Sequence, residues 1–234
     1  MKGAAFLQKK EIDMEFKKLM GTSITIEEPA VLLQQLAHFE ELMMVYRSAI
    51  REITTKLEVL NDELSMTGKQ NPIEFIKSRV KRPMSILNKL QRSGLEITEE
   101  NIVNHLNDVA GVRVVCSFVD DVYLVAEMLT KQDDIVVIKK KDYIKHPKEN
   151  GYRSYHLILE IPIFLSDRKL PVRVEVQLRT VAMDFWASLE HQMKYKKELP
   201  DAEAIGAQLR ECAETIASID QRMMDIRDQI TQCE

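Results

Sequence analysis

Residues 150–190 read NGYRSYHLILEIPIFLSDRKLPVRVEVQLRTVAMDFWASLE, and this stretch decides the fold. Two runs within it, Gly151–Ile161 and Val172–Arg179, follow the period of two that is typical of strands. The connection between them carries the turn residues Pro162, Ser166, Asp167 and Pro171. We therefore predict a hairpin with a loop, followed by a helix from about Val181.

The polar side chains of this hairpin are expected to gather on one face. Successive strand residues point to opposite sides, so one face takes Val172, Val174, Val176 and Leu178. The other face takes Arg173, Glu175, Gln177 and Arg179, and in the first run a shared face takes Tyr152, Ser154 and His156. The pattern fits a solvated antiparallel sheet as well as a binding surface, and alone it does not choose between them.

Helical patterns occupy both ends of the chain. Met1–Met20 mixes apolar and charged residues and is expected to be helical, and a long helix begins near Glu28 or Pro29. Its apolar positions alternate between spacings of three and four over Leu36–Leu64, and a last helix from Pro200 does the same over Leu209–Ile230. Such heptad stripes need a partner surface, within the chain or in another subunit.

The middle of the chain alternates helices and strands. Asn71-Pro72 is expected to open a helix that Pro83 interrupts, and Thr98 to cap a short helix that ends near Leu106. The remaining predicted elements are a strand at Val112–Phe118, a helix from Asp120 to about Thr130 and a strand at Ile135–Lys141. The sequence thus predicts an α/β (α+β) fold, with a mixed sheet of about four to five strands flanked by helices. We divide this single-domain protein into a helical extension (1–70), a core (71–197) and a C-terminal helix (198–234).

The composition is that of an ordinary globular protein. The chain has 234 residues, of which 45% are hydrophobic and 30% charged, with a formal net charge of −4. Cys116, Cys212 and Cys233 are too few and too scattered for a disulfide framework or a zinc site. Because no apolar run is long enough to span a membrane and the N-terminus lacks a signal-peptide core, we expect a cytoplasmic protein with no membrane partner.

Two basic patches stand out against the acidic balance. They lie within Lys77–Arg92 and Lys139–Arg153, and they indicate local anion sites. No glycine-rich phosphate loop is present, so side chains would have to hold phosphate. A row spaced by four, four and three residues on the expected helix consists of Lys81, Ser85, Lys89 and Arg92. Taken alone, such a row is more often a solvated basic face.

Two carboxylates come from separate parts of the predicted sheet. Asp108 precedes the strand that holds Arg113, and Glu175 lies in the second strand of the hairpin. Together they could hold Mg²⁺ beside substrate phosphates, because that ion usually takes one or two carboxylates and keeps waters. Taken singly, each has a commoner structural role, Asp108 as a loop residue and Glu175 as the cross-strand partner of an arginine.

Four blocks, in this order and spacing, resemble the RelA/SpoT-type alarmone synthetase domain. They are NPIEFIKSRVKRPMSILNKL from Asn71, DVAGVRVVCSFVDDV from Asp108, KENGYRSYHLIL from Lys148 and VEVQLRTVAMDFWASLEH from Val174. The length and the flanking helices are similar to those of the small alarmone synthetases, the stand-alone GTP pyrophosphokinases. The resemblance implies a nucleotidyltransferase-like synthetase fold and a Mg²⁺-dependent transfer of the β,γ-pyrophosphate of ATP to the 3′-hydroxyl of GDP or GTP. The products would be the alarmones ppGpp or pppGpp and AMP, and no hydrolase block is present.

The resemblance also implies roles for individual residues. Arg79 and Arg113 would enclose the adenine of ATP. The ATP phosphates would meet Lys81, Ser85, Lys89 and Arg92. Asp108 and Glu175 would hold Mg²⁺ at the catalytic centre, with Glu175 also the base for the 3′-hydroxyl. The acceptor, GDP or GTP, would contact Lys141, Lys148, Asn150, Tyr152, His156, Gln177 and Asp184, with Tyr152 stacked on guanine. The family often has Asn where this chain has Asp184, which lacks the amide donor.

Two other functions stay open at this point. Some relatives transfer pyrophosphate to the 3′ end of tRNA. A non-catalytic nucleotide sensor would have the same fold but no catalytic activity. The acidic net charge weighs mildly against tRNA, and the retention of Asp108 and Glu175 argues against a sensor. We expect neither a ribosome nor a nucleic acid to be required. The small synthetases use such terminal helices to form ring-like homotetramers, so the resemblance implies a homo-oligomer, specifically a tetramer.

Overall fold

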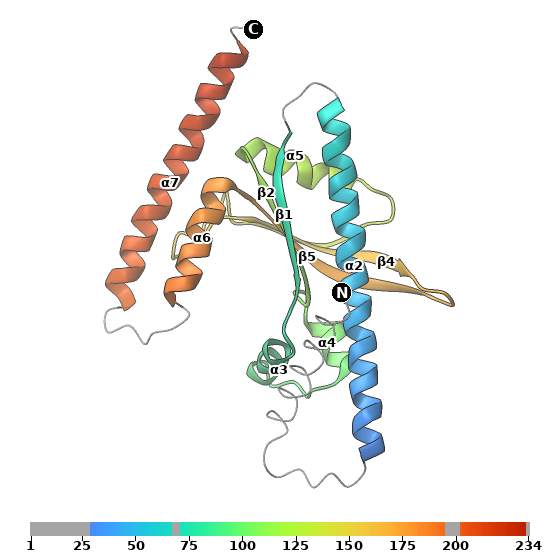
Figure 1. Ribbon diagram of the computed structural model, residues 1–234. Helices are drawn as coiled ribbons and strands as arrows, with labels where there is room; N and C mark the ends of the chain where they lie inside the picture. Colours follow the sequence, from blue (N-terminus) through green and yellow to red (C-terminus); the bar gives the residue numbers. More distant parts are fainter. Residues whose placement is uncertain (1–28, 67–70, 195–201, 233–234) are drawn as a thin grey trace, which may run out of the picture.

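A five-stranded mixed sheet forms the centre of the protein, seen in a computed structural model that describes residues 29–66, 71–194 and 202–232 (Figure 1). The strands are β1 (Ile73–Val80), β2 (Ala110–Cys116), β3 (Val136–Asp142), β4 (Tyr155–Phe164) and β5 (Lys169–Thr180). The helices of the described residues are α2 (Pro29–Met66), α3 (Pro83–Arg92), α4 (Glu99–His105), α5 (Val119–Thr130), α6 (Val181–Lys194) and α7 (Ala202–Thr231). The predicted fold class is confirmed. The helix expected at Met1–Met20 lies outside the described residues.

The predicted hairpin forms the middle of the sheet. The strand order is β1-β2-β5-β4-β3, in which β2 and β5 are parallel and the other neighbours are antiparallel. Strand β4 begins only at Tyr155, so Tyr152 and Ser154 precede it and do not share a strand face with His156. Ser154 is instead buried, and its hydroxyl donates a hydrogen bond to the Leu178 carbonyl at 3.1 Å.

Helices α2 and α5 cover one face of this sheet and enclose the core (Figure 1). The apolar side of β5 points into it, with Val172, Val174, Val176 and Leu178 all buried. The stripe predicted on α2 packs onto the same core through Met43, Tyr46, Ile50, Ile53 and Leu57. The partner surface that this stripe needs is therefore the chain's own sheet. Burial of each large apolar side chain there stabilises the fold by about 1.5–3 kcal/mol.

The helix predicted from Asn71 is wrong, because residues 73–80 form the edge strand β1 and α3 starts only at Pro83. The basic residues suggested a helical stripe, and a register shift between Ile73 and Phe75 hides the strand alternation. Pairing with the buried strand β2 outweighs the local pattern. Arg82 is extended, with φ −62° and ψ 143°, as expected for a residue before proline. Lys81 therefore lies outside the helix that carries Ser85, Lys89 and Arg92.

The two ends of the sheet carry different helices. Helices α6 and α7 lie side by side at one end, and α3 and α4 lie at the other (Figure 1). Thr98 caps α4 as predicted, since its hydroxyl accepts a hydrogen bond from the Asn101 amide at 3.1 Å. Within the described residues, no helix has the length and apolarity needed to cross a membrane. The face away from α2 and α5 is left between these helix pairs, and it is polar.

Candidate active site

The sheet register brings predicted site residues from separate strands into two rows on the face away from α2. Paired residues on neighbouring strands share a face, so the register alone places their side chains together. One row consists of Lys77, Arg113, Gln177, His156 and Lys141, one from each strand. The next row consists of Arg79, Gly111, Glu175, Ile158 and Lys139. Arg113 and Gln177, which are 64 positions apart in the chain, thus become neighbours.

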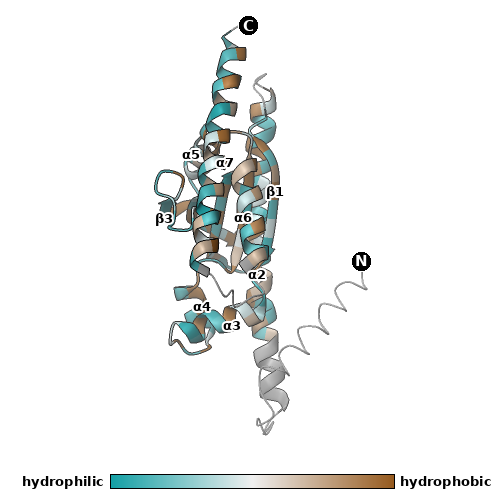
Figure 2. Ribbon diagram, turned by 90° about the vertical axis from the view of Figure 1, so that its left-hand side faces the viewer, coloured by the Kyte–Doolittle hydropathy of each residue, from teal (hydrophilic) through white to brown (hydrophobic). Residues whose placement is uncertain are grey.

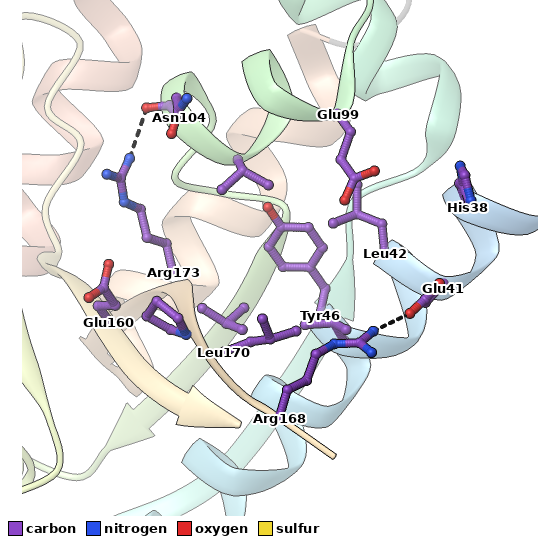
Figure 3. Close-up of a pocket in the computed structure, with 14 residues that line it drawn as sticks. His38, Glu41, Leu42, Tyr46, Glu99, Asn104, Glu160, Arg168, Leu170 and Arg173 are labelled. Atoms are coloured by element: carbon purple, nitrogen blue, oxygen red, sulfur yellow. Dashed lines mark hydrogen bonds and ion pairs between the residues drawn. The ribbon is translucent and has the colours of Figure 1, made fainter. Parts of the chain in front are cut away.

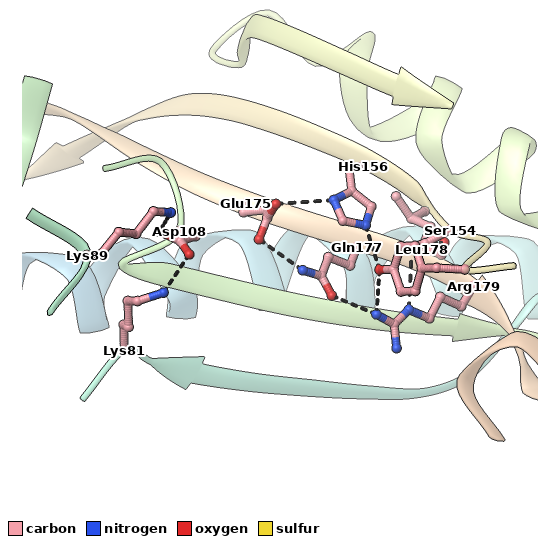
Figure 4. Close-up of polar contacts among 10 residues, drawn as sticks. Lys81, Lys89, Asp108, Ser154, His156, Glu175, Gln177, Leu178 and Arg179 are labelled. Carbon is pink, nitrogen blue, oxygen red and sulfur yellow. Dashed lines mark hydrogen bonds and ion pairs between the residues drawn. The ribbon is translucent and has the colours of Figure 1, made fainter. Parts of the chain in front are cut away.

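Asp108 lies at the start of β2 between two cations (Figure 4). The Lys81 ammonium donates to Oδ2 at 2.6 Å, and the Lys89 ammonium donates to Oδ1 at 2.8 Å. Burial alone would raise the pKa of the Asp108 carboxyl, but the hydrogen bonds from both lysines lower that pKa below its ordinary value. The strand end and α3 thus hold a carboxylate and two ammonium groups at one point of the face.

Glu175 belongs to a closed ring of hydrogen bonds (Figure 4). Its Oε1 lies 3.2 Å from Nδ1 of His156, and its Oε2 accepts from the Gln177 amide at 2.9 Å. Nε2 of His156 lies 2.8 Å from the Tyr152 hydroxyl. Arg179 closes the ring, since Nη2 donates to the Tyr152 hydroxyl at 2.7 Å and to the Gln177 carbonyl oxygen at 3.1 Å.

The ring determines the protonation of its members. Because a carboxylate only accepts, Nδ1 of His156 must carry the proton that faces Glu175, and Nε2 then accepts from the Tyr152 hydroxyl. Burial lowers the pKa of His156 below its ordinary value, so the imidazole is neutral at pH 7. Burial would raise the pKa of Glu175, but the hydrogen bond from His156 leads the effects that lower it, so Glu175 is a carboxylate.

Arg179 is the site residue that the sequence analysis missed. It is only 4% exposed, and besides the ring it donates from Nη1 to Oδ1 of Asp184 at 3.0 Å. The same Oδ1 pairs with Nη1 of Arg113 at 3.1 Å. The alternation of β5 already placed Arg179 on the polar face beside Glu175 and Gln177. That it is buried there, and shared by so many partners, depends on α6 and on the residues before β4.

The residues from Lys148 to Tyr152, called the acceptor loop below after the role that the resemblance implies for them, bring two further predicted residues to the same place. The Lys148 ammonium lies 4.8 Å from the ring centroid of Tyr143 and 4.9 Å from that of Tyr152. Asn150 donates its side-chain amide to Glu190 on α6 at 3.1 Å. The loop closes through a backbone hydrogen bond from Gly151 to Lys148 at 2.8 Å.

Other predicted residues stand apart from these contacts. Arg79, Ser85 and Arg92 are exposed, and the hydrogen bonds of the ring and of Asp108 do not involve them. Ser85, Lys89 and Arg92 still share one side of α3, because they follow each other at four and three residues. Lys141 lies on β3, opposite His156, and is half-buried.

A cavity of about 600 Å³ lies elsewhere, between α2, α4 and the β4–β5 hairpin (Figure 3). No predicted site residue lines it. Its arginines are already paired, Arg168 with Glu41 and Arg173 with the Asn104 carbonyl at 2.8 Å. We therefore place the site on the polar sheet face, where the charged groups converge, rather than in this cavity.

Comparison with known proteins identifies the family of the chain. The family model described as "Region found in RelA / SpoT proteins" matches residues 78–199. The chain is 44% identical to GTP pyrophosphokinase YwaC of Bacillus subtilis over 188 residues, which are 80% of this chain and 90% of that protein. It is 36% identical to GTP pyrophosphokinase YjbM of the same organism over 196 residues, 84% and 92% of the two chains.

Solved structures give the same answer. The crystal structure of small alarmone synthetase 1 from Bacillus subtilis bound to its product pppGpp superposes with a TM-score of 0.76 at 36% identity, over 82% of this chain and 98% of that one. Small alarmone synthetase 2 from the same organism gives 0.73 at 41% identity, over the same shares. The chain belongs to the RelA/SpoT family. Within that family, it is similar to the small alarmone synthetases over nearly their full length.

Proposed function

We propose that the chain is a GTP pyrophosphokinase that moves the β,γ-pyrophosphate of ATP to the 3′-hydroxyl of GDP or GTP. The observation that carries this proposal is the single polar face on which Asp108, with two lysines, lies near the Glu175 ring. Relatives that are 44% and 36% identical bear that activity in their names, which supports it. Because its substrates would be cytoplasmic nucleotides, we expect the protein in the cytoplasm.

ATP is assigned to the end of the sheet that holds β1 and α3. Lys81 and Lys89 are fixed there by Asp108, and Ser85 and Arg92 extend the same side of α3. Pre-positioned cations of this kind stabilise charge on a polyphosphate without having to reorganise. Arg79 and Arg113 lie in adjacent rows on β1 and β2, where their planar guanidinium groups could enclose adenine.

The acceptor nucleotide is assigned to the other side of the same face. Tyr152 offers its ring to guanine, and the acceptor nucleotide would also meet Lys141, Lys148, Asn150, His156 and Gln177. The ion pairs of Arg113 and Arg179 both use Oδ1 of Asp184, and we assign Oδ2 to the acceptor. An aspartate held in place by two arginines would present this oxygen to accept a hydrogen bond from a guanine N–H.

Mg²⁺ fits the two carboxylates of the face. Asp108 and Glu175 both have lowered pKa values against the effect of burial, so each is available as an anionic oxygen ligand. Among the described residues no three His, Cys, Asp or Glu side chains cluster as metal ligands, which suits an ion held by one or two carboxylates and substrate phosphates. The bound ion would neutralise phosphate charge during the transfer.

Glu175 is proposed to take the proton of the 3′-hydroxyl. Both of its oxygens are oriented, one by Nδ1–H of His156 and the other by the Gln177 amide. Those donors hold the carboxylate in place while the hydroxyl approaches a remaining lone pair. Alignment of the two nucleotides and charge stabilisation supply most of the acceleration in phosphoryl transfer, and the face provides fixed groups for both.

We also propose a homo-oligomer, specifically a tetramer, assembled through α7. The predicted stripe of α7 is exposed beyond Ile216, at 49% for Ile219, 51% for Met223, 48% for Ile226 and 59% for Ile230. Helix α6 adds an apolar row at intervals of four, Val181, Phe185, Leu189 and Met193. Figure 2 shows hydrophobic positions along both α6 and α7. Apolar surface of this extent commonly marks an interface. On α2, the stripe residues Met43, Tyr46, Ile50, Ile53 and Leu57 are buried on the chain's own sheet, so we do not assign them to the interface.

The decisive experiment is a reaction of the purified protein with ATP and Mg²⁺. Parallel samples receive GDP, GTP or tRNA, and chromatography separates the nucleotides. We expect ppGpp or pppGpp and an equal amount of AMP from the GDP and GTP samples. Label transferred to tRNA alone would show the alternative acceptor, and no AMP from any sample would contradict the proposal.

A further inference from the structure

The acceptor loop lies directly against α7. Gly151 has a φ of +87°, and a Cβ atom built on it would lie 2.5 Å from Cβ of Ala213 and 3.2 Å from Cα of Arg210. Real Cβ atoms essentially never show a contact as short as 2.5 Å, so the loop backbone touches the helix with no room for a side chain. Position 151 therefore requires glycine for two reasons, the left-handed backbone conformation and the close approach of the loop to α7.

Three further contacts join α7 to this part of the site. Nε of Arg210 donates to the Glu149 carbonyl of the loop at 2.6 Å. The indole N–H of Trp186 on α6 donates to the Leu209 carbonyl at 2.9 Å. Tyr152 packs against the apolar cluster of Trp186, Ala187, Leu209 and Ala213. The side chain proposed to stack on guanine thus packs against the α6–α7 pair.

Much of the loop itself is exposed and depends on these contacts. Lys148 and Glu149 are exposed, and Asn150 reaches α6 through Glu190. Ordering a loop when a ligand binds costs free energy and so weakens the affinity. A loop that is already held in its bound position avoids this cost. The position of α7 therefore decides how much of the acceptor-binding energy is retained.

We propose that α7 positions the acceptor loop, and that Arg210 and Ala213 are positioning residues for the acceptor nucleotide. The inference rests on the proposed function, since it takes Tyr152 and the loop as the acceptor side. Neither residue touches the reacting atoms in this proposal. Their effect is transmitted through the loop backbone, so it reaches the affinity for GDP and leaves that for ATP unchanged.

The first test compares three variants of α7. Arg210→Ala removes the donor to Glu149, Arg210→Lys keeps a cationic donor, and Arg222→Ala removes an exposed arginine of the same helix that takes no part in the loop contacts. We expect Arg210→Ala to raise the KM for GDP about tenfold, as follows from the loss of a hydrogen bond with a charged donor. The KM for ATP should stay unchanged, Arg210→Lys should recover part of the loss, and Arg222→Ala should match wild type.

The second test addresses the close contact itself. Gly151→Ala should raise the KM for GDP, and adding Ala213→Gly should recover part of it by removing the opposing Cβ. The recovery stays partial because alanine remains strained at a φ of +87°. Equal KM values for the single and double variants, or an Arg210→Ala variant equal to Arg222→Ala, would overturn the inference.

Calorimetric binding of GDP to the same variants separates the two proposals. If the wild-type protein forms no alarmone, the proposed reaction fails. The loop is then still tested, because the wild type should bind GDP and Arg210→Ala should bind it about tenfold more weakly. Wild-type protein that turns over normally, together with unchanged GDP binding in Arg210→Ala, contradicts the role of α7 alone.

Discussion

The Tyr152 hydroxyl lies 2.8 Å from Nε2 of His156, and through that imidazole it links the proposed guanine-stacking residue to the proposed base, Glu175. The phenol donates to a neutral imidazole and accepts from Arg179. The aromatic ring and the hydroxyl of Tyr152 therefore have separate tasks, one toward the nucleotide and one toward Glu175.

These tasks can be separated by two substitutions. The sequence alone suggests that Tyr152→Phe is harmless, because a ring face is what stacks, but the structure changes that expectation. Phenylalanine leaves His156 and Arg179 without a shared partner, so we expect kcat to fall about tenfold with little change in the KM for GDP. Tyr152→Ala should also raise that KM, since base stacking is worth roughly 1–3 kcal/mol. Steady-state kinetics with GDP varied at saturating ATP checks both, and a Phe variant with wild-type kcat refutes the coupling.

The carboxylates should be indispensable. Glu175→Gln keeps the shape but removes the charge, and its amide would face the donors from His156 and Gln177. We expect kcat to fall at least about 10²-fold, as for a lost catalytic base, and Asp108→Asn to behave similarly. Release of AMP measures the loss. Circular dichroism must show a folded variant, and near-wild-type turnover in Glu175→Gln would sink the assignment.

Arg179 should not tolerate lysine. A single ammonium cannot meet Tyr152, Gln177 and Asp184 at the angles that the guanidinium fork provides. We expect Arg179→Lys to lower kcat/KM at least about tenfold. Arg173→Lys is the matched control, because Arg173 lies on the same strand but donates to Asn104 and Asn107, away from the ring. Equal kinetics of the two variants would mean that the ring needs only a positive charge.

Folding stability should fall in mild acid because of His156. Its pKa is lowered by burial, so below about pH 6.5 the unfolded chain takes up a proton that the folded chain refuses. The contribution is present above that pH and is lost as the pH falls toward the lowered value. Asp121, whose pKa burial raises to about 6, acts in the opposite direction over part of this range. Comparison of Tm at pH 7 and 5.5 in wild type and His156→Gln isolates the histidine, and the variant should lose less.

The apolar stripes of α2 and α7 should respond differently to an introduced charge. Ile53 is 0% exposed on the sheet-facing side of α2, so Ile53→Glu should unfold the chain. Ile226 on α7 is 48% exposed, so Ile226→Glu should dissociate an oligomer and leave each subunit folded. Light scattering combined with circular dichroism distinguishes these results. A wild-type protein that is monomeric at micromolar concentration would contradict the proposed assembly.

The sequence predicted the central hairpin and the long helices α2 and α7, because their periodicity is long and regular. It failed at β1, where a register shift disguises the strand and pairing with β2 prevails. It placed Glu175, Gln177 and Arg179 on one face, since alternation alone decides that. The ion pair between Arg113 and Asp184 joins β2 to α6, and the contact of Gly151 with Ala213 joins the acceptor loop to α7. Such relationships depend on tertiary packing, which no local pattern encodes.

The order of the strands has one consequence beyond nucleotide binding. Strands β1 and β3 are the two edges of the sheet, and the basic patches of the sequence fall on them, with Lys77 on one and Lys139–Lys141 on the other. An unpaired edge is a template on which another copy could add a strand, and lysine is a common means of discouraging this. Lys141, which we propose to meet the acceptor nucleotide, would therefore also discourage the joining of neighbouring sheets, and replacing the edge lysines with apolar residues would promote aggregation.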